Sequence, residues 1–237
     1  MKRTSLILIL TFGIFYTSYC QKENDKNIFY VLNALGADLY ENASFDSEVL
    51  EKIEVGKMIV ATKVLESSQS KKIGDNFYLD GYFIRVNAKT SSGYIFSSDL
   101  TKFKPVLREI HKGITIPDIK GEKKNKTMAK RIVEYGNQEH EIEDEITEYE
   151  NATYTYTAFG GCFDHLYLYR NLNLSEVYHQ LTVHQVVINE TEMKIQIPKF
   201  IKKERNEYHF EGLGATTNLK LIENEDGSFT VSSCDCT

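Results

Sequence analysis

The sequence predicts a mainly β protein in which an N-terminal β unit, a basic linker and a C-terminal antiparallel β unit follow one another. Short runs rich in β-branched and aromatic residues recur along the 237 residues, which include 15 Tyr and 13 Phe. Glycine and Asn/Asp turn signals separate these runs at intervals that suit strands. A lysine-rich stretch with few large apolar residues divides the two series, and this composition is typical of a linker.

The first twenty residues have the form of an export signal. Lys2 and Arg3 provide a positive start, an apolar run occupies residues 6–16, and Cys20 ends a small-residue cleavage pattern. The run is shorter than the roughly 20 residues that a bilayer-spanning helix needs. We therefore expect residues 1–20 to be a cleaved signal peptide, and the remaining chain to work in the periplasm or outside the cell.

Cys20 leaves a second interpretation of the same signal open. In a bacterial lipoprotein the cysteine that ends the signal is retained and lipidated, which here would anchor the chain in the outer membrane. Tyr19 precedes it at a position where a small residue is usual for lipidation. No later stretch reaches spanning length, so we expect no transmembrane segment after cleavage.

The charge balance of the chain is acidic. There are 28 Lys and Arg residues against 34 Asp and Glu residues, which gives a net charge of −6, and removal of Lys2 and Arg3 with the signal makes it more negative still. Proteins that bind nucleic acid through its phosphates need a basic footprint. The composition therefore argues against nucleic acid as a partner.

Residues 27–104 are predicted to form one small all-β unit. Strand-like runs recur there with glycine between them, as expected where strands reverse over a few residues. The runs occupy residues 30–32, 37–40, 48–53, 58–64, 82–86 and 92–96. Within this series, residues 67–81 make an unusually long excursion before the aromatic pair Tyr82 and Phe83.

The motifs within residues 29–101 follow a characteristic order. A first strand precedes an apolar-polar-apolar stretch, a Ser before a Val-Leu pair, a Gly before a valine-rich strand, an aromatic before a Val-containing strand, and a closing Gly-aromatic-aliphatic with Ser and Leu. These motifs are Tyr30 and Val31; Ala37, Asp38 and Leu39; Ser47, Val49 and Leu50; Gly56, Ile59 and Val60; Tyr82 or Phe83 with Arg85 and Val86; Gly93, Tyr94 and Ile95; and Ser97, Ser98 and Leu100. In order and spacing, the segment resembles the bacterial SH3 (SH3b) family.

The resemblance to the SH3b family implies an SH3-like barrel and a non-catalytic module that binds peptides or cell-wall material beside another domain. Here Tyr or Phe replaces the family's usual tryptophans, which keeps the aromatic volume of a barrel core. Tyr40, Tyr82, Tyr94 and Phe96 are the candidates to line an aromatic groove. The alternative is that they belong to the core, because alternation along a strand turns only some of them outward.

Residues 105–138 are predicted to be a basic linker with a short helix. Lysines and turn residues dominate the segment. Thr127 is a candidate N-cap for a helix that ends at Gly136. The acidic run over residues 139–150 has apolar residues at helical spacing, and we interpret its charges as a solvated face.

Residues 139–237 are predicted to form a C-terminal β-rich domain, for which no family resemblance is identified. An antiparallel meander suits its alternating runs, since it buries one face of each strand. The runs occupy residues 152–159, 162–170, 181–188, 192–197, 207–212, 217–222 and 228–233. One helical turn is expected at residues 175–180, and the lysines from residue 199 onward are expected to protect an edge strand.

Three cysteines follow the signal, Cys162, Cys234 and Cys236. In an exported protein we expect Cys162 to form a disulfide with one of the other two and to leave one thiol over. An alternative makes Cys162 the nucleophile of a cell-wall cysteine peptidase, although the sequence around it lacks the expected Asp-Cys-Ser-Gly motif. The candidate bases for it are His165, His179, His184 and His209.

A zinc site is the other alternative for the cysteines. Cys162, His165, Cys234 and Cys236 offer four ligands if the last strand returns beside the Gly160 hairpin, although Cys-x-Cys spacing is tight for two tetrahedral ligands. An exported protein more often oxidises such thiols. We therefore expect a disulfide, with no metal and no cofactor.

Taken together, the residues predict an exported, non-catalytic binding protein. Its SH3b-like module is expected to recognise a cell-envelope peptide or glycan. The alternative is an accessory protein that binds an envelope protein through its C-terminal domain.

Overall fold

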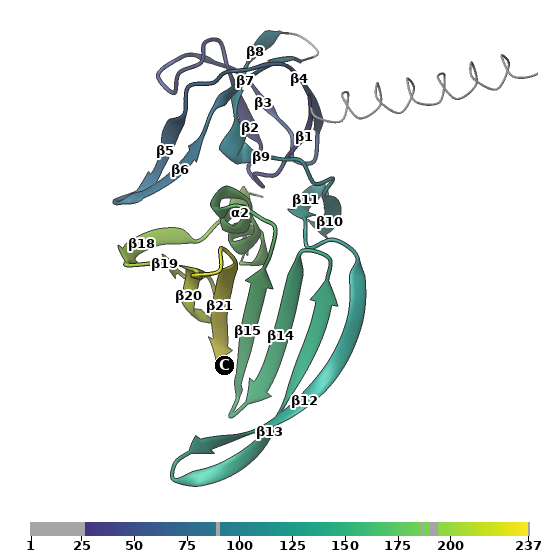
Figure 1. Cartoon of the computed structure of the whole chain (residues 1–237), viewed down its shortest axis with the longest axis vertical. Coiled ribbons are helices and arrows are strands. Elements are labelled where there is room, and N and C mark those ends of the chain that lie inside the picture. The colour runs from purple at the N-terminus through teal and green to yellow at the C-terminus, as the bar shows by residue number, and fades with distance from the viewer. Residues whose placement is uncertain (1–26, 89–90, 186, 190–193, 237) are drawn as a thin grey trace, which may run out of the picture.

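The computed structural model describes residues 27–88, 91–185, 187–189 and 194–236. The predicted signal peptide and the alternative lipid site at Cys20 lie outside these described residues. The protein is mainly β and its sheets are antiparallel, as the sequence predicts. The one α-helix in the described part of the chain, α2 (Leu174–His184), lies between an N-terminal group of strands and a larger C-terminal sheet (Figure 1).

The N-terminal sheet has seven strands in the order β3-β2-β8-β7-β4-β1-β9. Its elements are β1 (Ile28–Val31), β2 (Ala37–Tyr40), β3 (Val49–Ile53), β4 (Met58–Val64), β7 (Phe83–Asn87), β8 (Ser92–Phe96), the 3-10 turn η2 (Ser97–Asp99) and β9 (Leu100–Thr101). Inward side chains such as Val31, Leu39, Ile84 and Ile95 form one core. The strand order does not return on itself, so no barrel closes among the described strands.

The long excursion of residues 67–81 is a hairpin of β5 (Gln69–Gly74) and β6 (Phe77–Gly81). It leaves the N-terminal sheet and extends toward the C-terminal sheet (Figure 1). In its turn, Asn76 has a left-handed φ of 62°, a conformation that Asn adopts more readily than most residues. The excursion is therefore an ordered arm rather than a loop.

The hairpin packs into the C-terminal core. Phe77 and Leu79 are each 1% exposed and belong to the cluster that also contains Tyr208 and Phe210. The ring centroids of Phe77 and Tyr208 are 4.6 Å apart. The hairpin lies within the N-terminal unit of the sequence, but its apolar side chains pack in the core of the C-terminal unit.

The helix predicted within the basic segment is wrong, and so is the linker around it. Residues 105–138 instead contain β10 (Val106–His111), β11 (Ile114–Asp118) and β12 (Lys123–Tyr135). β12 pairs along its length with β13 (Gln138–Tyr149), which takes up the acidic run.

The basic and acidic runs are complementary strands, which explains the error. Lys126 Nζ lies 2.8 Å from Glu145 Oε1 on the facing strand. Arg131 Nε donates to Asp144 Oδ2 at 2.7 Å. Each run alone has the composition of a solvated stretch. In the paired strands, basic side chains of β12 neutralise acidic side chains of β13.

The C-terminal sheet has eight strands in the order β12-β13-β14-β15-β21-β20-β19-β18. Its remaining strands are β14 (Ala152–Phe159), β15 (Cys162–Tyr169), β18 (Lys199–Glu204), β19 (Glu207–Glu211), β20 (Thr216–Glu223) and β21 (Phe229–Cys236), and a separate hairpin consists of β16 (Val187–Asn189) and β17 (Lys194–Gln196). After α2 the chain enters this sheet at its far edge and returns inward, so the last strand pairs with β15. β18 is an edge strand, as its lysines predict.

Helix α2 is longer than the predicted single turn, and the strand predicted over residues 181–188 is wrong in its first half. The side chain of Asn173 accepts from Glu176 N at 3.0 Å, and Glu176 Oε2 accepts from Asn173 N at 3.0 Å, which forms a capping box. Val177 and Leu181, four residues apart, are both fully buried. Burial on both faces of α2 thus favours the helical conformation even where the sequence contains β-branched residues.

Candidate functional site

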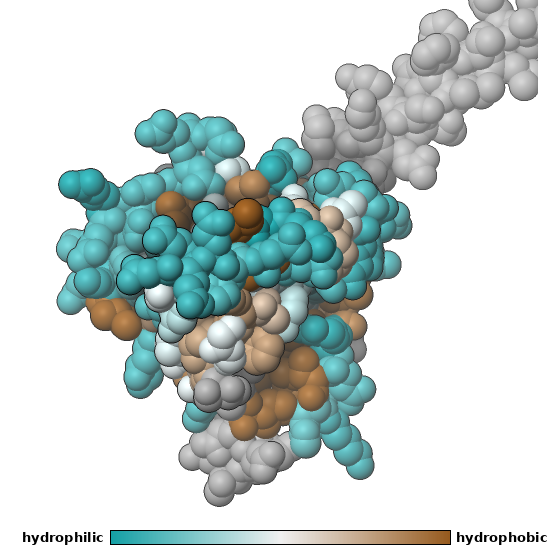
Figure 2. All heavy atoms as spheres, turned by 90° about the horizontal axis from the view of Figure 1, so that it is seen from below, coloured by the Kyte–Doolittle hydropathy of each residue, from teal (hydrophilic) through white to brown (hydrophobic). Residues whose placement is uncertain are grey.

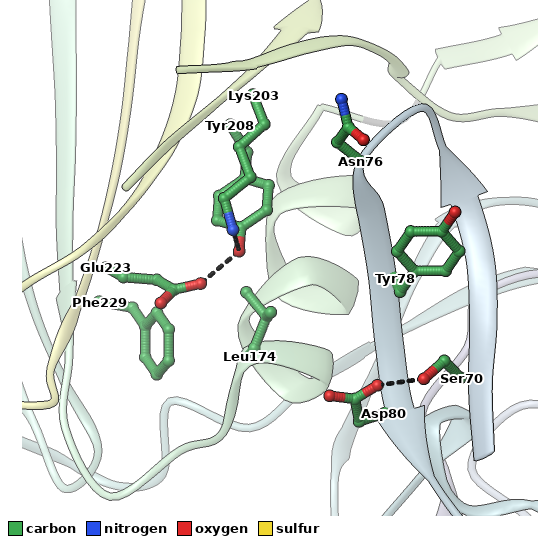
Figure 3. A pocket seen from close by; sticks show the side chains of 9 residues that line it. All are labelled: Ser70, Asn76, Tyr78, Asp80, Leu174, Lys203, Tyr208, Glu223 and Phe229. Carbon is green, nitrogen blue, oxygen red and sulfur yellow. Dashed lines mark hydrogen bonds between the residues drawn. The ribbon is translucent and has the colours of Figure 1, made fainter. Parts of the chain in front are cut away.

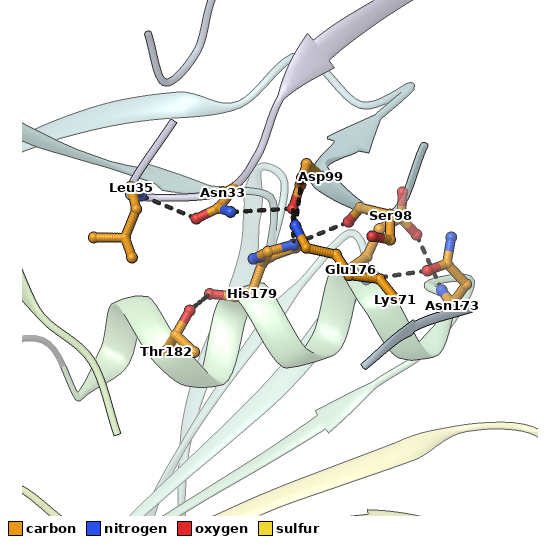
Figure 4. Close-up of polar contacts among 9 residues, drawn as sticks. All are labelled: Asn33, Leu35, Lys71, Ser98, Asp99, Asn173, Glu176, His179 and Thr182. Atoms are coloured by element: carbon orange, nitrogen blue, oxygen red, sulfur yellow. Dashed lines mark hydrogen bonds and ion pairs between the residues drawn. The ribbon is translucent and has the colours of Figure 1, made fainter. Parts of the chain in front are cut away.

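A buried polar network joins the N-terminal strands to α2 (Figure 4). Its centre is Asp99, whose side chain is 3% exposed. Lys71 Nζ of β5 donates to both oxygens of the Asp99 carboxylate at 2.7 and 2.9 Å, and Asn33 Nδ2 donates to Oδ1 at 3.0 Å. From α2, His179 Nε2 lies 2.9 Å from Ser98 O. The network fixes β5, η2 and α2 relative to one another.

His179 is the neutral member of this network. Since Ser98 O can only accept, His179 Nε2 carries the proton. Burial lowers the pKa of His179 to about 4, and the Asp99 carboxylate 3.6 Å from Nε2 does not offset that effect. Lys71 is therefore the cation that balances Asp99.

Glu176 adds a second polar contact between α2 and the N-terminal strands. Thr101 Oγ1 donates to Glu176 Oε1 at 2.6 Å, while the other carboxylate oxygen caps the helix. Burial raises the pKa of Glu176, and these hydrogen bonds oppose the rise. The Glu176 side chain thus caps the N-terminus of α2 and ties the helix to β9.

A cleft of about 600 Å³ lies between the β5–β6 hairpin and the β18–β21 half of the C-terminal sheet. In Figure 3 the hairpin side chains stand on one side, Lys203, Tyr208 and Glu223 stand on the other, and Leu174 of α2 lies between them. The lining residues are Ser70, Asn76, Tyr78, Asp80, Leu174, Lys203, Tyr208, Glu223 and Phe229. Residues from both units build this cleft, and the network around Asp99 holds the hairpin wall in place through Lys71.

The hairpin wall follows from the alternation of β6. Phe77 and Leu79 point into the core, so Tyr78 and Asp80 point away from it, and Tyr78 is 47% exposed. Across the hairpin, Ser70 Oγ donates to Asp80 Oδ1 at 2.5 Å. The wall therefore offers an accessible ring beside a carboxylate that is held in place.

The opposite wall is a hydrogen-bonded chain of three residues. Lys203 Nζ donates to Tyr208 Oη at 2.7 Å and lies 4.4 Å from the centroid of its ring. The Tyr208 hydroxyl in turn donates to the Glu223 carboxylate. Burial and the neighbouring Glu223 charge raise the pKa of Tyr208 above its ordinary value, so the phenol stays protonated.

These walls suit a polar ligand with some apolar surface. An ammonium group, two carboxylates, an amide and an exposed tyrosine converge on one cleft, which combines donors, acceptors and an aromatic surface. The carboxylates are already engaged, Asp80 by Ser70 and Glu223 by Tyr208. The arrangement fits recognition better than proton transfer.

The sequence did not identify these residues as candidates. The length of the excursion over residues 67–81 was the available signal, because an ordered insertion in a small β unit often carries function. Nothing local to the hairpin shows that Lys203, Tyr208 and Glu223 lie opposite it, since that proximity arises from the order of strands in the C-terminal sheet.

Of the four residues predicted to line an aromatic groove on the N-terminal unit, two belong to the core, which was the alternative interpretation, and two are partly buried. Phe96 is fully buried and Tyr40 is 8% exposed, and both pack with Phe83 in one cluster against which Tyr94 also packs. Tyr82 is half-buried and packs against the other N-terminal core instead. Residues two apart on β8 point the same way, so the cluster that buries Phe96 draws Tyr94 to it.

The cysteines form the predicted disulfide. Cys162 and Cys236 are bonded across neighbouring strands, and Cys234 is the thiol left over. The sulfur that the peptidase hypothesis requires as nucleophile is therefore already in a covalent bond.

The four candidate bases also contact other groups. His165 Nδ1 lies 2.8 Å from Tyr154 Oη, and His184 Nε2 lies 2.7 Å from Tyr169 Oη. His179 serves the network described above, and His209 Nε2 lies 3.6 Å from carboxylates on neighbouring residues. The hydrogen bonds of His165, His179 and His184 each join two elements of the fold.

Comparison of the chain with protein-family models, with curated proteins and with solved structures finds no match. In the described part of the chain, no helix has the length and apolar character to cross a membrane. The resemblance of residues 29–101 to the SH3b family stays a prediction, and the geometry of the cleft carries the functional argument.

Proposed function

We propose that this chain is an exported, non-catalytic binding protein that recognises a cell-envelope peptide or glycan in the cleft between the β5–β6 hairpin and the C-terminal sheet. The observation that carries the proposal is the position of Tyr78, exposed on the hairpin opposite the chain of Lys203, Tyr208 and Glu223. An N-terminal SH3b-type β unit would then serve as the support of the hairpin.

The chemistry of the cleft favours this class of ligand. Peptides and glycans present hydroxyl, amide and carboxylate groups next to apolar surface, and an exposed aromatic ring is a common anchor for such surfaces. Because the Lys71–Asp99 pair fixes the hairpin to η2 and Phe77 packs on Tyr208 of the opposite wall, the two walls are set before a ligand arrives. A preorganised site loses less conformational entropy on binding.

Two observations support export. The first twenty residues have the order of a signal peptide. A disulfide links Cys162 to Cys236, and such bonds persist mainly in oxidising compartments. Retention of Cys20 as a lipid anchor is the alternative fate of the same signal.

The test is binding of the chain from residue 21 onward to insoluble peptidoglycan, with soluble muropeptides titrated by calorimetry. Tyr78→Ala is expected to weaken binding on the order of tenfold, because a central aromatic anchor contributes more than about 1 kcal/mol. Tyr135→Ala is the matched control, since Tyr135 is 69% exposed and lies outside the cleft. Equal affinity of Tyr78→Ala and wild type, or no retention at any salt concentration, contradicts the proposal.

A partner protein is the second candidate, and one feature favours it. β12 is one edge strand of the eight-stranded sheet, and Met128, Ile132 and Tyr135 on it are 53%, 66% and 69% exposed. Figure 2 views the molecule from the end where the β12–β13 hairpin lies, and it shows apolar groups among hydrophilic ones. A pull-down from envelope extract that Ile132→Lys abolishes and Tyr78→Ala leaves unchanged would favour this candidate.

A further inference from the structure

Four potential metal ligands occupy one face of the sheet at the ends of β15 and β21. Cys162 faces Cys236, and two residues further along Asp164 faces Cys234. Because alternate residues of a strand share a face, these two successive pairs form a rectangle of three sulfurs and one carboxylate. The rectangle lies on the opposite face from His165, which follows Asp164 on β15.

The sulfurs are already close to the spacing of a metal site. Sγ of Cys234 lies 3.5 Å from Sγ of Cys236, and the three sulfurs all lie within 4.8 Å of one another. Tetrahedral zinc with Zn–S bonds of about 2.3 Å places its sulfur ligands about 3.8 Å apart. After reduction, the sulfurs of Cys162 and Cys236 must separate to reach this spacing.

Asp164 is the fourth donor. Asp164 and Cys234 are directly opposite on the paired strands, so their side chains share one face of the sheet and are neighbours. The three sulfurs form the compact group, and the carboxylate lies beside it on the Cys234 side.

We propose that reduction of the disulfide between Cys162 and Cys236 creates a binding site for one thiophilic divalent cation, of which Zn²⁺ is the test case. A dithiol supplies two electrons and two protons, the S–S bond breaks to give two thiols, and the dithiol becomes a cyclic disulfide. The cation then replaces the protons of the three thiols and accepts Asp164 as its fourth ligand. Disulfide and metal are alternative links between the same two strand ends.

The site is accessible from solvent. Cys236 and Asp164 are exposed and the other two cysteines are half-buried. The turn that leads into Cys162 contains Gly160, where an added Cβ would meet no atom within 4 Å. A cation or a reductant can therefore reach the sulfurs without opening the core.

The donor set corrects the sequence hypothesis of zinc bound by three cysteines and His165. His165 Nδ1 is bonded to Tyr154 Oη, and Nε2 lies 3.3 Å from Asp235 Oδ2 on the other face of the sheet. Both ring nitrogens thus face away from the sulfurs. Asp164 takes the place of His165 in the donor set.

The experiment compares oxidised protein with protein reduced by a dithiol and desalted without oxygen. Zinc per chain is measured by elemental analysis, and Cd²⁺ is titrated while thiolate-to-metal charge-transfer absorption is followed. The reduced chain is expected to bind one equivalent and the oxidised chain none. Equal binding by the two forms, or no binding by the reduced form, overturns the proposal.

Three variants distinguish the proposed ligands from unfolded thiols. Cys234→Ser keeps the disulfide and is expected to lose zinc binding after reduction, and Asp164→Asn is expected to weaken it by on the order of ten- to a hundredfold. His165→Gln is the matched control and is expected to bind like wild type. Should Asp164→Asn bind as tightly as wild type, or should His165→Gln lose the metal, the donor set is wrong. Circular dichroism of each reduced protein reports whether it remains folded.

Discussion

Phe77 and Tyr78 show how two adjacent residues of one strand take opposite roles. Phe77 is 1% exposed and packs on Tyr208, whereas Tyr78 is 47% exposed and lines the cleft. Tyr208 completes the arrangement, because its ring belongs to the core and its hydroxyl bridges Lys203 and Glu223. Core packing and the lining of the cleft therefore meet at the level of single residues.

Phe77→Ala is expected to lower the free energy of unfolding by about 3–5 kcal/mol, since it removes a large ring from a packed core and leaves a cavity. Tyr78→Ala, one residue away, is expected to change it by less than about 1 kcal/mol, because the ring is exposed. Urea denaturation followed by circular dichroism measures both. A loss of similar size in the two variants would show that the hairpin does not share the C-terminal core.

At the scale of elements, the sequence predicted what depends on local patterns. Alternation and turn residues located most strands of the N-terminal unit and of the C-terminal sheet. Alternation does not predict β12, because this edge strand is exposed along almost its whole length and no buried residue recurs at every second position. Local preferences miss half of α2, because residues such as Thr182 and Val183 favour strands, and their burial by two packed layers overrides that preference.

The link between β15 and β21 is a second feature of this scale. The disulfide joins residues 74 positions apart. A cross-link over a loop of this length is expected to stabilise the fold by about 4 kcal/mol in the chain-entropy account. Cys162→Ser/Cys236→Ser should therefore unfold at lower urea concentration than wild type, and dithiol treatment should lower the midpoint of wild type to a similar value.

Cys234→Ser is the control for that measurement. It keeps the disulfide, so its midpoint is expected to match that of oxidised wild type in the absence of metal. Identical midpoints for the doubly substituted protein and oxidised wild type would mean that the β15–β21 pairing alone holds these strand ends.

At the scale of the whole molecule, the network around Asp99 makes stability depend on pH. The folded state keeps His179 neutral with a pKa of about 4, against 6.5 for an unperturbed histidine. The unfolded chain therefore binds more protons below pH 6.5, and the folded state loses stability as the pH falls from 6.5 toward 4. The contribution of His179 to this loss of unfolding free energy is expected to reach at most about 3 kcal/mol.

His179→Gln isolates this contribution. Glutamine can still donate to Ser98 O but does not titrate, so the fall in unfolding free energy between pH 7 and pH 5 should be smaller in the variant than in wild type. Glu176 has a raised pKa, so its contribution to the unfolding free energy rises as the pH falls, and this contribution is present in both proteins. Parallel pH profiles for the two proteins would contradict this role of His179.

The cleft itself lay beyond prediction from the sequence. Its walls come from a hairpin inserted in the first unit and from strands near the end of the chain, and no local pattern connects Tyr78 to Glu223. The disulfide was predictable because three cysteines in a chain with the form of an export signal leave few choices. The proposed ligand class came from a family resemblance, whereas the place to look for it came from tertiary structure.

The insertion of Phe77 and Leu79 into the distant core has a consequence for how the chain can be divided. A fragment that ends near residue 104 would expose these two side chains to water, and the complementary fragment would keep a hole where they belong. Neither half is thus a self-sufficient folding unit. When the two fragments are mixed, we expect them to reassociate, because the apolar side chains that one exposes fill the hole that the other contains.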